Sequence, residues 1–239
     1  MRAVVITLLV GLVRSTAYAS PVPDFAGDVF PFASTEKTLS NGLKIVVVPT
    51  DFPGIVALHI NVQVGSRNET EPGKTGFAHL FEHMMFRGTK ANPEAKYQAA
   101  MAAAGARQNA YTEDDYTDYF ATFSKDDLDR VLALEADRFM NLAFDENQIR
   151  TEARAVLGEY NKNSADPWNK LEEKLRDSAF SSHPYKHTTM GLIADIEDMP
   201  NQYAFAREFY GKWYRPERTT VIVVGDVQAS AVSAMVEKY

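Results

Sequence analysis

Two histidines separated by one helical turn stand inside an almost entirely apolar segment of the chain. The segment runs Gly76-Phe77-Ala78-His79-Leu80-Phe81-Glu82-His83-Met84-Met85-Phe86. On a helix, positions i and i+4 project from one face, so the rings of His79 and His83 can hold a single ion, with Glu82 beside them. Polar side chains in a buried helix are costly without a partner, which favours a ligand role. The segment predicts a buried helix that carries a metal site; the alternative is a helix whose histidines merely face the core or the solvent.

The composition restricts how such a site can be completed. The 239 residues include five histidines and no cysteine, so thiolate ligands and thiol catalysis are excluded and carboxylates remain as further ligands. The order His-x-x-Glu-His is the inverse of the commoner His-Glu-x-x-His pattern and is typical of inverzincins. Zinc in such sites takes three protein ligands and keeps one position for water, whose pKa falls to about 7 and whose proton a neighbouring carboxylate can take.

The third ligand can come from the helix predicted over residues 145–163. Glu152 and Glu159 are seven residues apart on this helix and therefore lie on one face, which the apolar residues between them place beside packed interior. A single glutamate on a helix is as readily a solvated surface residue. Spacing alone therefore leaves the third ligand open.

The order of the predicted elements indicates an α+β fold. Asn41-Gly42 before a β-branched run predicts a hairpin, and the alternating apolar residues of 55–64 predict the next strand. Further strands are predicted at 107–112, 117–123 and 219–224, and helices at 75–86, 93–104, 125–142, 145–163, 168–180, 200–213 and 229–239. Strands gather early, helices follow, and one strand returns near the end. This order favours one domain, residues 37–239, in which a mostly antiparallel sheet packs against a layer of helices.

The first 36 residues are expected to lie outside that domain. Arg2, the apolar run 3–13 and the small-x-small pattern Ala17-Tyr18-Ala19 predict a signal peptide over residues 1–19, and hence a periplasmic or secreted protein. A retained membrane tether or a buried N-terminal helix is the alternative. The run is too short to span a bilayer, which needs about 20 residues, so no stable membrane span is expected after signal removal. Residues 20–36 contain prolines without periodicity and are interpreted as a leader or linker. The net charge of -7 argues against a nucleic-acid partner.

Several motifs, in order and at matching spacing, resemble the family of pitrilysin, insulin-degrading enzyme and mitochondrial processing peptidase. Residues 76–89 resemble its zinc-site helix, 105–112 its substrate-strand motif and 152–159 its second zinc motif. The resemblance also includes Asn41-Gly42-Leu43, Pro184-Tyr185 and residues 214–226, so it covers nearly all of the chain after residue 37. Each pattern alone is weak, but their common order makes the match specific.

The resemblance implies a zinc-dependent endopeptidase that acts on unfolded or short polypeptides. It implies that one Zn²⁺ per chain is ligated by His79, His83 and Glu159, and that Glu82 is the general base that activates water. Glu152 would orient a zinc-bound histidine through its other ring nitrogen.

The resemblance also places Asn109, Ala110 and Tyr111 on an exposed strand edge, where a peptide adds as an extra strand. For Asn109, a turn position is the alternative. His183 and His187 are also four residues apart, but Pro184 breaks a helix there, so a pair of loop histidines is expected rather than a second metal site.

Members of this family are built from two homologous halves that close around the peptide, and this sequence resembles the first half alone. We therefore expect either a piece of a longer product or a chain completed by a homologous second-half subunit. The alternative function is a non-catalytic, peptide-binding or structural partner subunit of a two-chain peptidase. Non-catalytic members of the family usually lack a zinc ligand or the general base. This sequence contains the three expected ligands, His79, His83 and Glu159, and the expected base, Glu82.

Overall fold

The central sheet follows the apolar patterning of the chain. In the computed structural model, which describes residues 32–239, six strands form one sheet in the order β1-β2-β6-β3-β5-β4. The strands are β1 (Thr35–Thr38), β2 (Lys44–Pro49), β3 (Ile55–Val62), β4 (Arg107–Thr112), β5 (Thr117–Ser124) and β6 (Thr219–Gly225). β2 and β6 are parallel, and the other neighbouring pairs are antiparallel. The predicted α+β fold with a mostly antiparallel sheet is confirmed.

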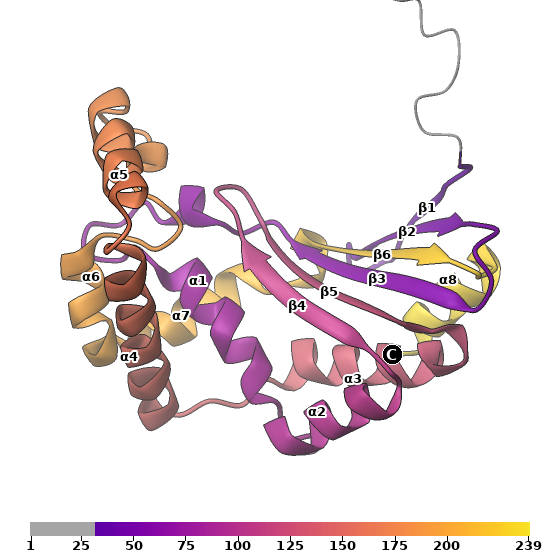
Figure 1. Cartoon of the computed structure of the whole chain (residues 1–239). Coiled ribbons are helices and arrows are strands. Elements are labelled where there is room, and N and C mark those ends of the chain that lie inside the picture. The colour runs from indigo at the N-terminus through magenta and orange to yellow at the C-terminus, as the bar shows by residue number, and fades with distance from the viewer. Residues whose placement is uncertain (1–31) are drawn as a thin grey trace, which may run out of the picture. The chain divides into compact units, whose positions relative to one another are not determined.

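Helices cover one face of this sheet. The α-helices of the described residues are α1 (Phe77–Met84), α2 (Glu94–Ala103), α3 (Leu128–Asn141), α4 (Glu146–Asn163), α5 (Pro167–Ala179), α6 (Ile193–Asp198), α7 (Tyr203–Trp213) and α8 (Ala229–Lys238). Short 3-10 helices are η1 (Ser66–Asn68), η2 (Met85–Arg87), η3 (Lys125–Asp127), η4 (Pro184–Lys186), η5 (Met199–Asn201) and η6 (Pro216–Arg218). Figure 1 shows α2, α3 and α8 along the sheet, while α4, α5 and α6 gather beyond the end of β4, with α1 between α4 and β4.

The core lies between the sheet and these helices. Along β3 the side chains of Val56, Leu58, Ile60 and Val62 are buried, whereas the residues between them, on the opposite face, remain partly exposed. Strands β5 and β6 flank β3 in register, with Ala121 and Val223 opposite Leu58. Because side chains alternate along a strand, this register directs one apolar row from each strand toward the helices.

Three differences from the sequence prediction concern β1, α6 and α7 (Tyr203–Trp213). β1 begins at Thr35, so the sheet starts two residues before the expected boundary at residue 37; all four of its residues are exposed, and no apolar alternation marks them. α6 was not predicted, because its six residues make less than two helical turns and cannot display a helical period. The helix predicted from residue 200 begins at Tyr203, after η5.

The predicted signal peptide, residues 1–19, lies outside the described residues, as do residues 20–31 of the predicted leader. Across residues 32–239, none of the helices combines the length and the hydropathy that crossing a bilayer requires.

Candidate metal centre

Helix α1 carries the two histidines of the motif through the core. Six of its eight residues are buried, namely Phe77, Ala78, His79, Leu80, Phe81 and Met84. The helix starts after Gly76, whose φ of 90° is in the left-handed region, and a Cβ there would lie 2.9 Å from the main-chain oxygen of Met190. Glycine is needed for this close approach. The packing therefore fixes both the start of α1 and the direction in which its histidines project.

Helix α4 brings the predicted carboxylates to the same place. Asp145 accepts the main-chain N–H of Gln148, and the Gln148 side chain accepts that of Asp145, so the helix begins with a capping box. The buried residues of α4 recur at helical spacing and face the protein interior; they are Ile149, Glu152, Ala153 and Val156. Glu159 continues that face by one turn, which places its carboxylate beside α1.

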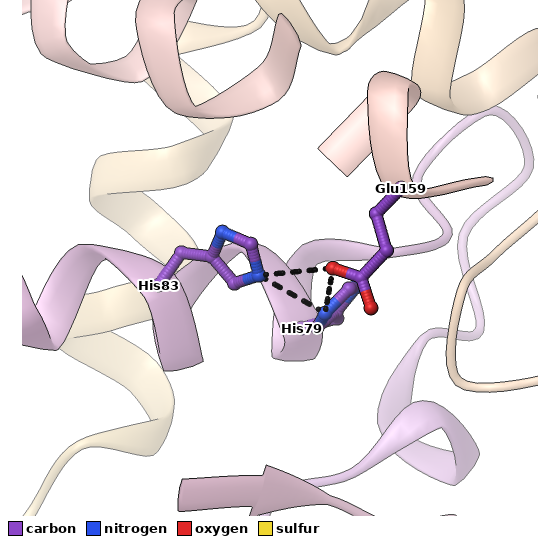
Figure 2. A group of neighbouring side chains, drawn as sticks. All are labelled: His79, His83 and Glu159. Carbon is purple, nitrogen blue, oxygen red and sulfur yellow. Dashed lines mark hydrogen bonds and ion pairs between the residues drawn. The ribbon is translucent and has the colours of Figure 1, made fainter. Parts of the chain in front are cut away.

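Three potential metal ligands converge from these two helices. Figure 2 shows His79 and His83 of α1 meeting Glu159 of α4. The two Nε2 atoms are 3.2 Å apart, and Oε2 of Glu159 lies 3.5 Å from each of them. A tetrahedral zinc ion with bonds of about 2.1 Å holds its ligands about 3.4 Å apart. The two imidazole nitrogens and the carboxylate oxygen therefore fit zinc in both chemistry and spacing.

The environments of the two imidazoles differ. Burial, together with the neighbouring His83, lowers the pKa of His79 to about 4. A hydrogen bond to Glu152 raises the pKa of His83, against the opposing effect of burial. A metal ligand must offer an unprotonated nitrogen, which His79 provides at neutral pH.

Glu152 contacts the ring atom of His83 that does not face the other ligands. Its Oε2 lies 3.5 Å from Nδ1 of His83, and its side chain is 4% exposed. The guanidinium of Arg87 is its second partner. Burial by itself would raise the pKa of Glu152, but the hydrogen bond with His83 and the charge of Arg87 lower it. A buried, ionised carboxylate therefore stands behind His83.

Glu82 lies beside the ligands and is held by β4. Its Oε2 accepts a hydrogen bond of 2.6 Å from the hydroxyl of Thr112. Burial raises the pKa of Glu82, and the hydrogen bond from Thr112 opposes this rise. No role was predicted for Thr112, although the residue ends the substrate-strand motif at residues 105–112.

The residues predicted to bind substrate lie on the edge strand of the sheet. Asn109, Ala110 and Tyr111 belong to β4, which pairs with β5 alone among the described strands. Asn109 is thus a strand residue rather than a turn residue. Glu113 donates its N–H to the carbonyl of Tyr116. Because antiparallel pairs alternate, the N–H and C=O groups of Ala110 point away from β5 and toward the free edge.

A cavity of about 420 Å³ opens onto the potential ligands. His79, Glu82 and Glu159 line it, together with the end of β4, one polar face of α5 and the loop Thr188–Met190. Neither α5 nor this loop was predicted at the site, because their proximity depends on tertiary packing between distant segments.

The remaining histidine pair lies elsewhere. His183 and His187 flank η4, where Nδ1 of His183 accepts the main-chain N–H of Tyr185. His187 is buried, and its Nδ1 lies 3.0 Å from the carbonyl oxygen of Thr188.

Comparison with known protein families gives two matches. The model described as "Insulinase (Peptidase family M16)" matches residues 45–192, and "Peptidase M16 inactive domain" matches residues 202–239. The first match contains the three potential ligands and Glu82. The curated "Zinc protease PqqE" of Helicobacter pylori is 32% identical over 204 residues, which are 84% of this chain and 45% of that protein.

Solved structures are similar over the same region. The crystal structure of a protease from Helicobacter pylori has a TM-score of 0.83 and 31% identity, over 87% of this chain and 50% of that one. The periplasmic protease PqqL from Escherichia coli has a TM-score of 0.76 and 28% identity, over 87% of this chain and 24% of that one. The chain spans about half the length of the curated relatives that it first matches.

Proposed function

Since the chain belongs to the insulinase family of peptidases (peptidase family M16), we propose that it is a zinc-dependent endopeptidase that hydrolyses unfolded or short polypeptides. The observation that carries this proposal is the convergence of His79, His83 and Glu159, whose potential ligand atoms all lie within 4.8 Å of one another. Glu82 lies beside this group, and β4, whose outer edge pairs with no other described strand, ends at Thr112, which contacts Glu82.

In the proposed reaction, His79, His83 and Glu159 would hold one zinc ion per chain. When bound, the ion would supply a Lewis acid that polarises the substrate carbonyl and lowers the pKa of a water molecule to about 7. Glu82 takes the proton of the water as it attacks the carbonyl and passes a proton to the leaving amine. Glu152 fixes the ring of His83 through Nδ1, so that Nε2 points toward the other ligands.

The proposed substrate is an extended peptide that adds to β4 as a further strand. The N–H and C=O groups of Ala110 face the free edge, and Asn109 and Tyr111 flank them on the opposite face of the sheet. A folded protein has few unpaired segments that can form such a ladder, whereas unfolded and short polypeptides supply them readily.

We also propose that a homologous second half completes the cavity, either in the same product or as a separate subunit. The greater length of the relatives supports this proposal. The signal-peptide pattern at residues 1–19 supports export to the periplasm or beyond, and PqqL is a periplasmic protease.

A non-catalytic, peptide-binding subunit is the second candidate, because residues 202–239 match a model described as an inactive domain. That match covers α7, β6 and α8. Against it, the two histidines, Glu159 and Glu82 all lie in the region that matches the insulinase model.

Two measurements test the proposal. Elemental analysis of the purified chain should find one zinc per chain in the wild type and in Glu82→Gln. In an assembly completed by the second half, an unstructured fluorogenic peptide should be cleaved by the wild type and about a thousandfold more slowly by Glu82→Gln, because the base is lost while the metal stays. Zinc binding without cleavage by the completed wild-type assembly would favour the non-catalytic candidate, and equal cleavage by both assemblies would contradict the role of Glu82.

A further inference from the structure

Thr112 joins the free edge of β4 to the carboxylate of Glu82. Its hydroxyl donates the 2.6 Å hydrogen bond to Oε2 of Glu82. This contact restricts the position of the carboxylate beside the strand. Its loss would leave a partly buried oxygen short of a partner.

The alternation of side chains along β4 explains why the hydroxyl reaches Glu82. Glu113 pairs with Tyr116, so the alternation of antiparallel pairs turns the main-chain groups of Thr112 toward the free edge, like those of Ala110. Side chains at positions two apart share a face, and Ala110 is buried on the face that packs against α1. The Thr112 hydroxyl therefore projects toward α1, where Glu82 lies.

The same strand therefore carries both the edge proposed to receive the peptide and the residue that contacts Glu82. Thr112 lies two residues after Ala110, whose main-chain groups face that edge.

We propose that Thr112 is a positioning residue that holds the carboxylate of Glu82 beside the edge of β4 on which the peptide is proposed to add. This inference rests on the proposed function, since it assumes that Glu82 acts on a substrate bound at the zinc site. Two inhibitors can separate failure of this inference from failure of the proposed function, because only one of them shares a proton with Glu82.

The probes are a short peptide hydroxamate and the corresponding peptide thiol. A hydroxamate at a zinc site shares its proton with the neighbouring carboxylate, whereas a thiol binds the metal as a thiolate without that help. Thr112→Val should weaken hydroxamate binding about tenfold, the loss expected for a hydrogen bond to a charged group. It should leave thiol binding and zinc content unchanged, and Thr112→Ser should restore hydroxamate binding.

A double-mutant cycle then assigns the effect to Glu82. In the Glu82→Gln background, Thr112→Val should change hydroxamate affinity by less than about twofold, because coupled residues are non-additive. Thr122→Val, the same substitution at an exposed position of β5, is the matched control and should behave as the wild type. In the cleavage assay, Thr112→Val should lower kcat and leave KM unchanged.

The outcomes distinguish failure of the proposed role of Thr112 from failure of the proposed function. If Thr112→Val binds both probes as the wild type does, or if Thr112→Ser does not restore hydroxamate binding, the proposed role of Thr112 is wrong. An undiminished effect in the Glu82→Gln background also overturns it. If the wild type takes up no zinc and binds neither probe, the proposed function fails, and the inference fails with it. If Thr112→Val loses thiol binding as well, the same measurements are made on Thr112→Ala. Loss of thiol binding in Thr112→Ala too would show that Thr112 supports the structure in general and does not position Glu82.

Discussion

At the scale of single residues, Glu152 shows how a buried charge can serve a metal ligand. Its carboxylate stands between the ring of His83 and the guanidinium of Arg87, and only 4% of its side chain is exposed. An unpaired carboxylate at such a position would carry a large desolvation cost. The two partners remove that cost, and the contact with Nδ1 fixes the orientation of the imidazole.

We expect Glu152→Ala to lower zinc affinity about 10- to 100-fold without removing a direct ligand. The ring of His83 would lose the partner that fixes its orientation, and Arg87 would lose its buried counter-charge. Competition with a chelator measures the affinity directly. Glu146→Ala, an exposed position on the same helix, is the control and should bind zinc as the wild type does. Equal affinities in the two variants would exclude this role for Glu152.

Apart from what the family resemblance implied for Glu152 and Glu159, residue patterns alone could predict the site only where its contacts are local. His79 and His83 come together because one helical turn separates them, and Glu82 follows from the same turn. The spacing of Glu152 and Glu159 placed both on one face of α4, but not against α1, since that depends on tertiary packing. The hydrogen bond from Thr112 to Glu82 likewise joins a strand to a helix, and no sequence period reports such a contact.

At the scale of elements, a buried carboxyl group caps the helix that bears the histidines. Glu69 accepts the main-chain N–H groups of Gly76 at 2.8 Å and Ala78 at 2.7 Å. These donors have no partner within the helix, so the carboxyl group satisfies groups that would otherwise be buried without hydrogen bonds. Asp195 of α6 fixes the preceding residue, Thr75, through its N–H and its hydroxyl. The start of α1 is therefore held by side chains from two other segments.

This cap makes stability depend on pH. Burial raises the pKa of Glu69 from its ordinary 4.5 to about 8, although the main-chain N–H groups oppose the rise. The folded state thus binds the proton more tightly than the unfolded state, and this contribution to the free energy of unfolding is fully present below pH 4.5. It is lost as the pH rises through 8.

Glu69→Gln should therefore flatten the decline of the free energy of unfolding between pH 4.5 and 8. Urea denaturation at several pH values measures the slope in each protein. Glu71→Gln, an exposed neighbour in the same segment, should keep the slope of the wild type. Parallel curves for the wild type and Glu69→Gln would show that Glu69 does not titrate in this way.

Element boundaries could be predicted where apolar residues repeat at a regular period. β3 and β6 alternate buried and partly exposed residues along their length, so both were found from the sequence. β1 consists of exposed polar residues, so no apolar period marks its bounds, although the Asn41-Gly42 turn predicted that a strand would precede β2 in a hairpin. α6 is too short to show a period, yet its Asp195 contributes to the support of α1.

At the scale of the whole molecule, the proposed metal site links two distant parts of the chain. His79 and His83 precede β4 and β5, whereas Glu159 follows α3, and the helices α1 and α4 meet only in the folded state. A zinc ion held by all three residues would therefore bind the folded chain and not the unfolded one. Its binding free energy would add directly to stability.

We expect zinc added at about 1,000 times its Kd to stabilise the metal-free chain by about 4 kcal/mol. For a domain of this size, that gain raises Tm by about 10 °C. Calorimetry with and without zinc measures the shift. Glu82→Gln should show the same rise, because Glu82 is not a ligand in the proposed site, whereas His83→Ala should show almost none. A rise that survives His83→Ala would mean that zinc binds elsewhere. The absence of a rise in the wild type would mean that the ion does not join α1 to α4, and the convergence of the two helices would then need another explanation.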